Sequence, residues 1–455
     1  MDIYGLLFQK LLYPTWETGL RRRPTLLHHR ELEQTQWCSL DELLTLQERS
    51  LQRLLDHVWN NVPHERSRYA RAGVGPGDVR RLDDLQKLPL LTREEAMNHH
   101  DARKSVAPPL AAIDKTTSGT TGRPLAFAYD RGSEYWRQAV KIRGYSWAGY
   151  RPGDRSFHFW GSPQLGRPPL ARRVKASLDR SLRREHYVDC TARSDVALGR
   201  VVDEIERVKP KALLCYAQAG AALARYVNRS GRRGWGDLPV IAAAERLFPT
   251  DRAALVEAFG PGVFETYGNR EVMLIGSECE AHQGLHLSME NLIVELIVRD
   301  GDRQRPAEPG EVGEVALTDL HNYGAPFVRY LTGDLAVEHP HERCACGRWL
   351  KRLKGVEGRA TDTLRDAEGR PVSGLFFNVL FAYLTDQVRE FQVVQRKDSA
   401  IELRIVPTAG FDDALVDAIK QHAARFLPGI EIRAQLLSEL VPDGNGKLRV
   451  VVVET

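Results

Sequence analysis

A short run of hydroxyl and glycine residues at positions 116–124 is well suited to hold a polyphosphate. It reads Thr-Thr-Ser-Gly-Thr-Thr-Gly-Arg-Pro, which leaves little apolar surface to bury. Its glycines and closing proline therefore indicate a loop. Glycine lets the backbone approach a ligand closely, and clustered N–H and O–H donors suit phosphate oxygens. The run is not a Walker loop, because no Gly-Lys-Ser or Gly-Lys-Thr closes it. A solvated polar loop is the alternative.

Five motifs, in order along the chain, resemble those of the adenylate-forming enzymes. The run Ser-Gly-Thr-Thr-Gly-Arg-Pro resembles their phosphate loop, and residues 265–271 resemble their Tyr-Gly-x-x-Glu motif. Residues 330–334 resemble the motif that ends in a ribose-binding aspartate, 358–359 the hinge motif, and 446–449 the Gly-Lys-x-x-Arg end signal. Each motif is weak alone, but the ordered set is specific. From about residue 40 onward, the nearest likeness is to phenylacetate–CoA ligase-like proteins, including adenylate-forming proteins of capsular polysaccharide gene clusters.

The resemblance implies an ATP site built from these motifs. It implies that Tyr267 stacks beside adenine, that Asp334 accepts both ribose hydroxyls and that Glu271 binds Mg²⁺. A carboxylate offers two acceptors to a diol, and a hard oxygen ligand suits Mg²⁺. The expected ATP-binding residues are Thr117, Ser118, Gly119, Thr120, Thr121, Gly122, Glu245, Tyr267, Asp334 and Arg359. The expected catalytic residues are Glu271 and Lys447, whose ammonium would neutralise charge at the α-phosphate.

The chemistry so implied is the activation of a carboxylic acid by ATP. A carboxylate oxygen attacks the α-phosphorus and pyrophosphate leaves, so two anions must meet among cations and donors. The expected enzyme is an adenylate-forming ligase that makes acyl-AMP and passes the acyl group to a nucleophile, with the CoA thiol as first choice. The alternatives are an amide or ester ligase of a natural-product or surface-polysaccharide pathway, with an amine, hydroxyl or carrier protein as acceptor, and a catalytically inactive nucleotide-binding protein. Lys447, Glu271 and Asp334 argue against the last.

The chain departs from the family pattern just after Arg359. The family usually has x-Asp-Asp there, whereas this chain has Ala-Thr-Asp, with Thr361 at the pivot position. The segment at 365–372 also lacks the family's Ile-x-x-x-Gly run, which helps to form the CoA channel. Adenylation is therefore better supported than thioester formation.

A group of cysteine and histidine residues predicts a metal site. Cys344 and Cys346 lie in one tight loop, and Cys279 and His286 come earlier in the chain. Three thiolates and one imidazole make a structural Zn²⁺ site. His282 is a competing ligand, but His286 is preferred because Gly-Leu-His is the form usual in the family, some of whose members carry such a site. The alternative is free thiols in a reducing cytoplasm.

Length and composition narrow the class of protein. The chain has 455 residues, six cysteines and a formal net charge of +4. This length predicts two or more domains, and the small net charge argues against a nucleic-acid binder. Six scattered cysteines are too few for a disulfide framework. No apolar run approaches a membrane span, and the N-terminus lacks a signal-peptide pattern. We therefore expect a cytoplasmic protein without a membrane span.

Strands that alternate with helices predict an α/β fold with a largely parallel sheet. A large N-terminal domain, residues 1–358, would hold the ATP and carboxylate sites. A small mobile α+β domain, residues 359–455, would carry Lys447. The phosphate loop and Tyr267 are expected at carboxyl ends of parallel strands, where such domains bind ligands.

Helix signals are uneven along the N-terminal part. Ser39 with Glu42, and Thr92 with Glu95, have the spacing of capping boxes and predict two helix starts. Residues 1–38 are mixed and basic, and we expect an irregular lead-in.

The pocket for the acid is expected between a helix at 132–149, a strand at 157–160 and the segment near Tyr267. Three aromatic residues there suggest an apolar or aromatic acid, although each of them also suits a protein core: Trp136, Phe159 and Trp160. The basic stretch at 167–187 is interpreted as a solvated helix and loop, with a landing site for CoA phosphates or an acidic carrier protein as the alternative.

Overall fold

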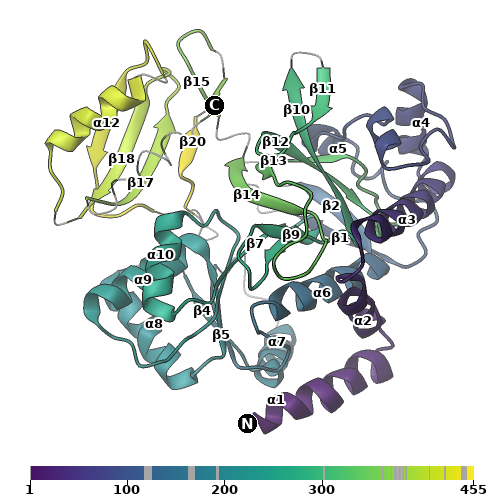
Figure 1. The fold of residues 1–455 in the computed structure, drawn as a ribbon, viewed down its shortest axis with the longest axis horizontal. Coiled ribbons are helices and arrows are strands. Elements are labelled where there is room, and N and C mark those ends of the chain that lie inside the picture. The colour runs from purple at the N-terminus through teal and green to yellow at the C-terminus, as the bar shows by residue number, and fades with distance from the viewer. Residues whose placement is uncertain are drawn as a thin grey trace.

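The computed structural model has the α/β fold that the sequence predicts, with a large body and a smaller C-terminal unit (Figure 1). It describes residues 2–116, 125–161, 170–190, 194–300, 303–359, 363–369, 371–373, 377, 381, 384, 387–408, 410–424, 427–441 and 448–454.

Twelve strands form one sheet through the body. Their order across it is β11-β10-β12-β13-β14-β9-β8-β7-β6-β5-β3-β4. The strands are β3 (Ser156–Trp160), β4 (Glu185–Asp189), β5 (Ala212–Tyr216), β6 (Val240–Ala243), β7 (Val263–Asn269), β8 (Met273–Glu278), β9 (Leu285–Leu287), β10 (Leu292–Asp300), β11 (Arg303–Pro306), β12 (Val312–Asp319), β13 (Tyr330–Glu338) and β14 (Arg352–Arg359).

Only one side of this sheet is parallel. The neighbours β4, β3, β5, β6 and β7 pair in parallel. From the β7–β8 pair to the β10–β11 pair every pairing is antiparallel. The expectation of a largely parallel sheet is therefore wrong beyond β7. Helices no longer separate the strands there, and short connections join antiparallel neighbours.

Helices cover both faces of the parallel side. On one face, α8 (Asp195–Val208), α9 (Ala217–Ser230) and α10 (Pro249–Phe259) bury Phe157 and Phe159 of β3 (Figure 1). On the other face, Tyr145 of α6 (Arg131–Ser146) packs against Leu214 and Ile241. Because side chains alternate along a strand, His158 of β3 points to the α6 face.

Most of residues 2–38 are helical, so the expected irregular lead-in is wrong. They form α1 (Ile3–Leu7), two π-helices η1 (Phe8–Leu12) and η2 (Thr15–Leu20), and α2 (Thr25–Thr35). Phe8 and Leu32 are buried, and α2 packs on α6. Packing against the body stabilises these helices, which local periodicity does not reveal.

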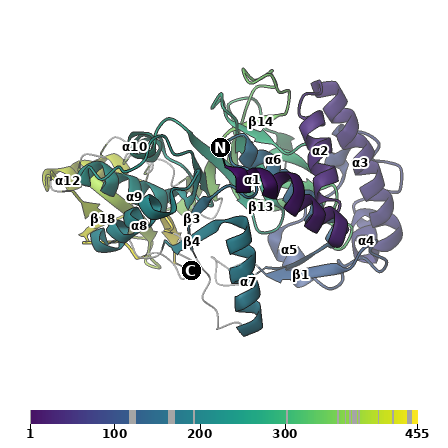
Figure 2. The same ribbon diagram turned by 90° about the horizontal axis from the view of Figure 1, so that it is seen from below.

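Both predicted capping boxes are present. The Ser39 hydroxyl accepts the Glu42 N–H at the start of α3 (Leu40–Asn61), and Thr92 does the same for Glu95 at the start of α5 (Arg93–Asn98). The other helices of the body are α4 (Pro63–Arg71), the 3-10 helix η3 (Asp83–Lys87) and α7 (Leu170–Arg183), which projects from it in Figure 2. None of the helices in the described part of the chain is both long and apolar enough to cross a bilayer.

The segment that contains the predicted phosphate loop joins two antiparallel strands. Strand β1 (Ala112–Thr116) pairs with β2 (Ala126–Asp130), and Thr116 lies opposite Ala126. The sequence predicts this loop at the carboxyl end of a parallel strand, and this prediction is wrong because β1, which precedes it, pairs only with β2 among the described strands. An alternating pattern identifies a strand but not the partner with which it pairs.

The C-terminal residues form a unit with its own core. Four strands lie in the order β19 (Ile432–Leu436), β18 (Ile401–Pro407), β17 (Val388–Gln395) and β20 (Val451–Val453), beside α12 (Ala414–Ala424). A hairpin of β15 (Thr363–Arg365) and β16 (Pro371–Ser373) precedes them. Apolar side chains of the unit pack together, among them Phe377, Leu403 and Ile419. Figure 1 shows this unit beside α10. The proposed boundary after residue 358 falls at the end of β14.

Candidate active site and metal centre

Tyr267 and Asp334 lie in contact, although they are 67 residues apart. The Tyr267 hydroxyl donates a hydrogen bond to Oδ2 of Asp334 at 2.8 Å, and both side chains are buried. Tyr267 lies in β7 and Asp334 in β13, with three strands between them in the sheet. A flat sheet would hold such strands about 19 Å apart. The sheet therefore curls strongly here and brings the two motifs together.

Glu271 joins this group from the turn after β7. Its Oε1 lies 3.4 Å from Nη1 of Arg93 and accepts a hydrogen bond from the Tyr330 hydroxyl at 3.4 Å. Tyr330 precedes Asp334 in β13. Burial and the neighbouring charge of Glu271 raise the pKa of Tyr330, so its hydroxyl remains a donor. Four acidic or phenolic motif residues, Tyr267, Glu271, Tyr330 and Asp334, thus share one buried region.

Arg93 is a candidate site residue that sequence reasoning missed. It is the first residue of α5 and follows the N-cap Thr92 directly. The sequence indicated only a helix start here, from the spacing of Thr92 and Glu95. Its contact with Glu271, 178 residues away, had no local signal.

Glu245 links the body to the C-terminal unit. Its Oε2 accepts the N–H of Gln218 at 3.0 Å, and its Oε1 accepts the N–H of Leu448 at 3.1 Å. The next residue, Arg246, pairs with Glu357 near the end of β14 at 2.5 Å. Residues 245 and 246 therefore hold two separate parts of the chain that follows β13.

Several predicted residues lie outside the part that the structure describes. They are Thr117, Ser118, Gly119, Thr120, Thr121, Gly122, Thr361 and Lys447, together with the side chain of Arg359. Leu448, which follows Lys447 directly, is the described residue nearest to that lysine in the chain.

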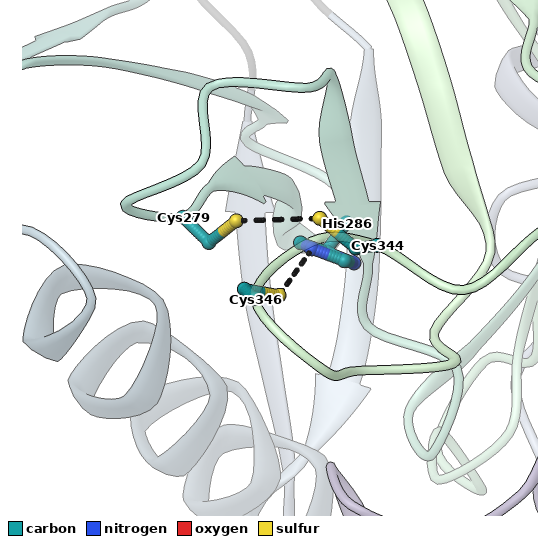
Figure 3. A group of neighbouring side chains, drawn as sticks. All are labelled: Cys279, His286, Cys344 and Cys346. Carbon is teal, nitrogen blue, oxygen red and sulfur yellow. Dashed lines mark hydrogen bonds between the residues drawn. The ribbon is translucent and has the colours of Figure 1, made fainter.

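Cys279, His286, Cys344 and Cys346 converge on one point (Figure 3). Their four candidate ligand atoms all lie within 4.8 Å of one another. Sγ of Cys279 is 3.8 Å from Sγ of Cys344, and Sγ of Cys346 is 3.4 Å from Nε2 of His286. Ligands of a tetrahedral Zn²⁺ at about 2.3 Å from the metal would lie about 3.8 Å apart. The donor set and its spacing therefore fit zinc.

The surroundings of the cluster orient its ligands. Nδ1 of His286 lies 3.3 Å from the carbonyl oxygen of Leu350, which leaves Nε2 to face the cysteines. Burial raises the pKa of Cys346, but hydrogen bonds from His286 and Arg348 outweigh it and lower the pKa to about 6. The competing residue His282 instead lies 3.5 Å from Glu278. The structure therefore brings His286, and not His282, to the three cysteines.

A pair of acidic residues lies between the two groups. Glu278, directly before Cys279, accepts the backbone N–H of Glu265, two residues before Tyr267. Burial and the charge of Glu278 raise the pKa of Glu265 to about 7, despite the neighbouring Arg252. Glu265 therefore changes its charge near neutral pH.

A cavity of about 370 Å³ lies between α6, the strands β3, β4 and β5, and the N-terminal helices. Two of its walls, α6 and β3, are those that the sequence predicts for the acid pocket. Phe8 and Tyr13 form the third wall, in place of the predicted segment near Tyr267.

Of the three aromatic residues named for that pocket, only Trp160 lines the cavity. Phe159 points to the opposite face of the sheet and lies in the core. Trp136 is stacked between the rings of His28 and His321, at 4.2 and 4.0 Å. The aromatic character of these residues did not reveal which face each one would occupy.

Comparison with known proteins identifies relatives over about three quarters of the chain or more. No family model matches the chain. It is 26% identical over 373 residues to a phenylacetate–coenzyme A ligase of Thermus thermophilus, a match that covers 80% of this chain and 80% of that protein. It is also 27% identical over 355 residues to a phenylacetate–coenzyme A ligase of Escherichia coli, and this match covers 73% of this chain and 75% of that protein.

Solved structures share the fold over most of the chain. A 2-hydroxyisobutyryl-CoA ligase in the postadenylation state, in complex with 2-HIB-AMP, has a TM-score of 0.72 and 20% identity, over 93% of this chain and 92% of that chain. The same ligase in the thioesterification state, with 2-HIB-AMP and CoA, has a TM-score of 0.58 over the same shares.

Proposed function

We propose that this chain, a relative of the phenylacetate–CoA ligases with the fold of adenylate-forming enzymes, activates a carboxylic acid with ATP. The products of the first step are acyl-AMP and pyrophosphate, and the acyl group then passes to the CoA thiol. One observation carries the proposal. Three motif residues from separate elements, Tyr267, Glu271 and Asp334, meet in one buried region of a curled sheet.

Each of these residues has a chemical role in the proposal. Asp334 holds the ribose diol, because a carboxylate accepts two hydroxyl donors. The Tyr267 hydroxyl fixes the orientation of that carboxylate and leaves the phenol ring beside the adenine. Glu271 would hold Mg²⁺, which neutralises phosphate charge when bound. Arg93 and the Tyr330 hydroxyl orient the Glu271 carboxylate.

The C-terminal unit is proposed to carry Lys447 to the α-phosphate. The hydrogen bond from Leu448 to Glu245 supports this role, since it holds the adjacent residue against the body. Positive charge at the α-phosphate is needed when two anions meet there.

Thioester formation is the preferred second step. None of the relatives named above is an amide or ester ligase, and the named relatives use coenzyme A. An amine, hydroxyl or carrier-protein acceptor, or an inactive nucleotide-binding protein, is the alternative. A cytoplasmic location remains a prediction from the sequence.

A structural zinc ion is part of the proposal. Cys279, His286, Cys344 and Cys346 would hold it and so fasten the end of β8 to the loop between β13 and β14. A closed set of four protein ligands leaves no position for substrate, which is the pattern of a structural site.

Carboxylate-dependent ATP–pyrophosphate exchange tests the proposal. Purified protein with Mg²⁺, ATP and a panel of aryl and short aliphatic acids is expected to exchange labelled pyrophosphate with at least one acid. Addition of CoA is then expected to give the acyl-CoA, measured by mass spectrometry. Exchange with no acid in the panel would contradict acyl-AMP formation, and exchange without acyl-CoA would point to another acceptor.

A further inference from the structure

The cavity between α6 and β3 contains a lysine with no partner. Lys141 lines the cavity and is partly exposed to it. Its ammonium forms no hydrogen bond or ion pair with any described residue. Enclosure by protein lowers the pKa of Lys141, and the charge of Glu185 only partly offsets this effect. Enclosing an ammonium group in protein costs free energy unless a hydrogen-bond acceptor binds it.

The other polar groups of the cavity do not supply that acceptor. Glu185 accepts the hydroxyl of Tyr187 at 3.2 Å. Burial lowers the pKa of His158 to about 3, so this imidazole is neutral, and it is bonded to Ser156 at 2.9 Å. Arg183 also lines the cavity, but Asp179, one turn earlier in α7, lies 3.5 Å from its Nε and balances its charge. Lys141 is then the cation of the lining that has no ion-pair partner among the described residues, and the cavity is suited to a guest with an anionic group beside that lysine.

One end of the cavity points toward the candidate nucleotide residues. Gln138, Lys141, Ile142 and Tyr145 line it from one face of α6, at the spacing of successive helical turns. Nε2 of Gln138 lies 4.0 Å from Sδ of Met273, which pairs with Asn269 of the Tyr267 motif. Gln138 therefore marks the nucleotide end, and Lys141 lies about 4.5 Å further along the helix.

Aromatic rings stand at both ends of the cavity. Trp160 stands at the carboxyl end of β3 and contacts Tyr216, which precedes α9, so it lies at the nucleotide end. Beyond Lys141, the rings of Tyr145 and Tyr150 line the cavity, and Phe8 and Tyr13 close it from the N-terminal helices. Its volume of about 370 Å³ is in the range of small-molecule sites.

We propose that this cavity holds the acyl group and that Lys141 binds a second carboxylate on it. The preferred substrates are then aromatic dicarboxylic acids, whose activated carboxyl faces the nucleotide and whose second carboxylate meets Lys141. The inference rests on the proposed function, because it names the class of acid that the same site activates.

Matched pairs of substituted phenylacetic acids test the inference. Each pair has a carboxylate or a methyl group at ring position 3 or 4, so only one member carries a second negative charge. The wild type is expected to favour the carboxylate member by ten-fold or more in kcat/KM for pyrophosphate release, as for a charge-assisted hydrogen bond.

Lys141→Met keeps the length of the side chain and removes the ammonium. It is expected to lower kcat/KM for the carboxylate member ten- to hundred-fold and to change that of the methyl member less than three-fold. Lys175→Met on α7 is the matched control, because this lysine is exposed, and it is expected to leave both values unchanged. Lys141→Gln replaces the methionine variant if the latter does not fold.

The outcomes separate the inference from the proposed function. A wild type that favours the methyl members, or a Lys141 variant that keeps the wild-type ratio, overturns the inference while acyl-AMP formation stands. If no acid drives pyrophosphate release, the proposed function fails.

Thermal unfolding then tests the inference without any catalytic readout, since a bound acid raises the Tm of the protein. The carboxylate members are expected to raise the Tm of the wild type and not that of Lys141→Met, and equal shifts overturn it.

Discussion

The metal cluster and the candidate nucleotide residues are assembled in different ways. His286 lies in β9, Cys279 directly follows β8, and the two cysteines of one loop lie between β13 and β14, and these four strands are neighbours in the sheet. Tyr267 lies in β7 and Asp334 in β13, and three other strands lie between these two in the sheet. Local strand register can form the cluster, whereas the nucleotide residues also need the curl of the sheet. The first should therefore be the more robust unit, and the second the more dependent on the whole fold.

The largest expected effect tests the part of the nucleotide site that the C-terminal unit contributes. Lys447→Ala is expected to reduce acyl-AMP formation about 10²- to 10³-fold, as for the loss of a transition-state donor. Acyl transfer from supplied acyl-AMP should survive much better. Pyrophosphate release and product formation from synthetic acyl-AMP are the two measurements. Lys397→Ala, an exposed lysine of the same unit, is the control. An equal fall of both rates would contradict the assignment of Lys447 to the first step only.

The metal cluster should respond in stability rather than in chemistry. Metal analysis is expected to give about one zinc per chain. If Cys346→Ser weakens zinc binding a hundredfold, the free energy of unfolding falls by about 2.7 kcal/mol under otherwise saturating zinc. Denaturant unfolding and kcat measure the two effects, and Cys38→Ser is the control outside the cluster. A protein that binds no zinc after zinc-supplemented expression would remove the proposed centre.

The ribose contact gives an intermediate effect. Asp334→Asn keeps the shape of the side chain but removes its charge, which is expected to cost about 1.5–3 kcal/mol, or about ten- to hundred-fold in ATP affinity. Tyr267→Phe removes only the hydroxyl that donates to Asp334 and should cost about 1 kcal/mol. Calorimetric titration with ATP measures both. An unchanged affinity in Asp334→Asn would mean that the nucleotide binds elsewhere.

The smallest effect concerns Glu265, which lies between the two regions. A carboxyl whose pKa rises from 4.5 to about 7 on folding destabilises the folded state as the pH rises through that interval. Glu265→Gln cannot ionise, so its stability relative to the wild type should increase by about 2 kcal/mol between pH 5.5 and pH 8. Denaturant unfolding at both pH values measures this difference. The same difference at both values would show that Glu265 keeps an ordinary pKa.

Local spacing predicted those features that depend on neighbouring residues. The Ser39 and Thr92 capping boxes are present where the sequence indicated them. The contact of Tyr267 with Asp334 and that of Arg93 with Glu271 join residues far apart in the chain. The helices before residue 38 depend likewise on packing against distant parts of the chain. Periodicity carries no information about such contacts, which is why these features were missed or misplaced.

Glu245 and Arg246 place an attachment of the C-terminal unit beside the strand from which that unit leaves. Glu245 holds Leu448 through a backbone N–H, and Arg246 pairs with Glu357 in β14, where the chain leaves the large sheet. The Glu357 contact lies within the body, so a rotation of the C-terminal unit has to release Leu448 but not Glu357. One contact that can break therefore stands next to one that can stay, and the unit should turn about the end of β14 as a fixed point.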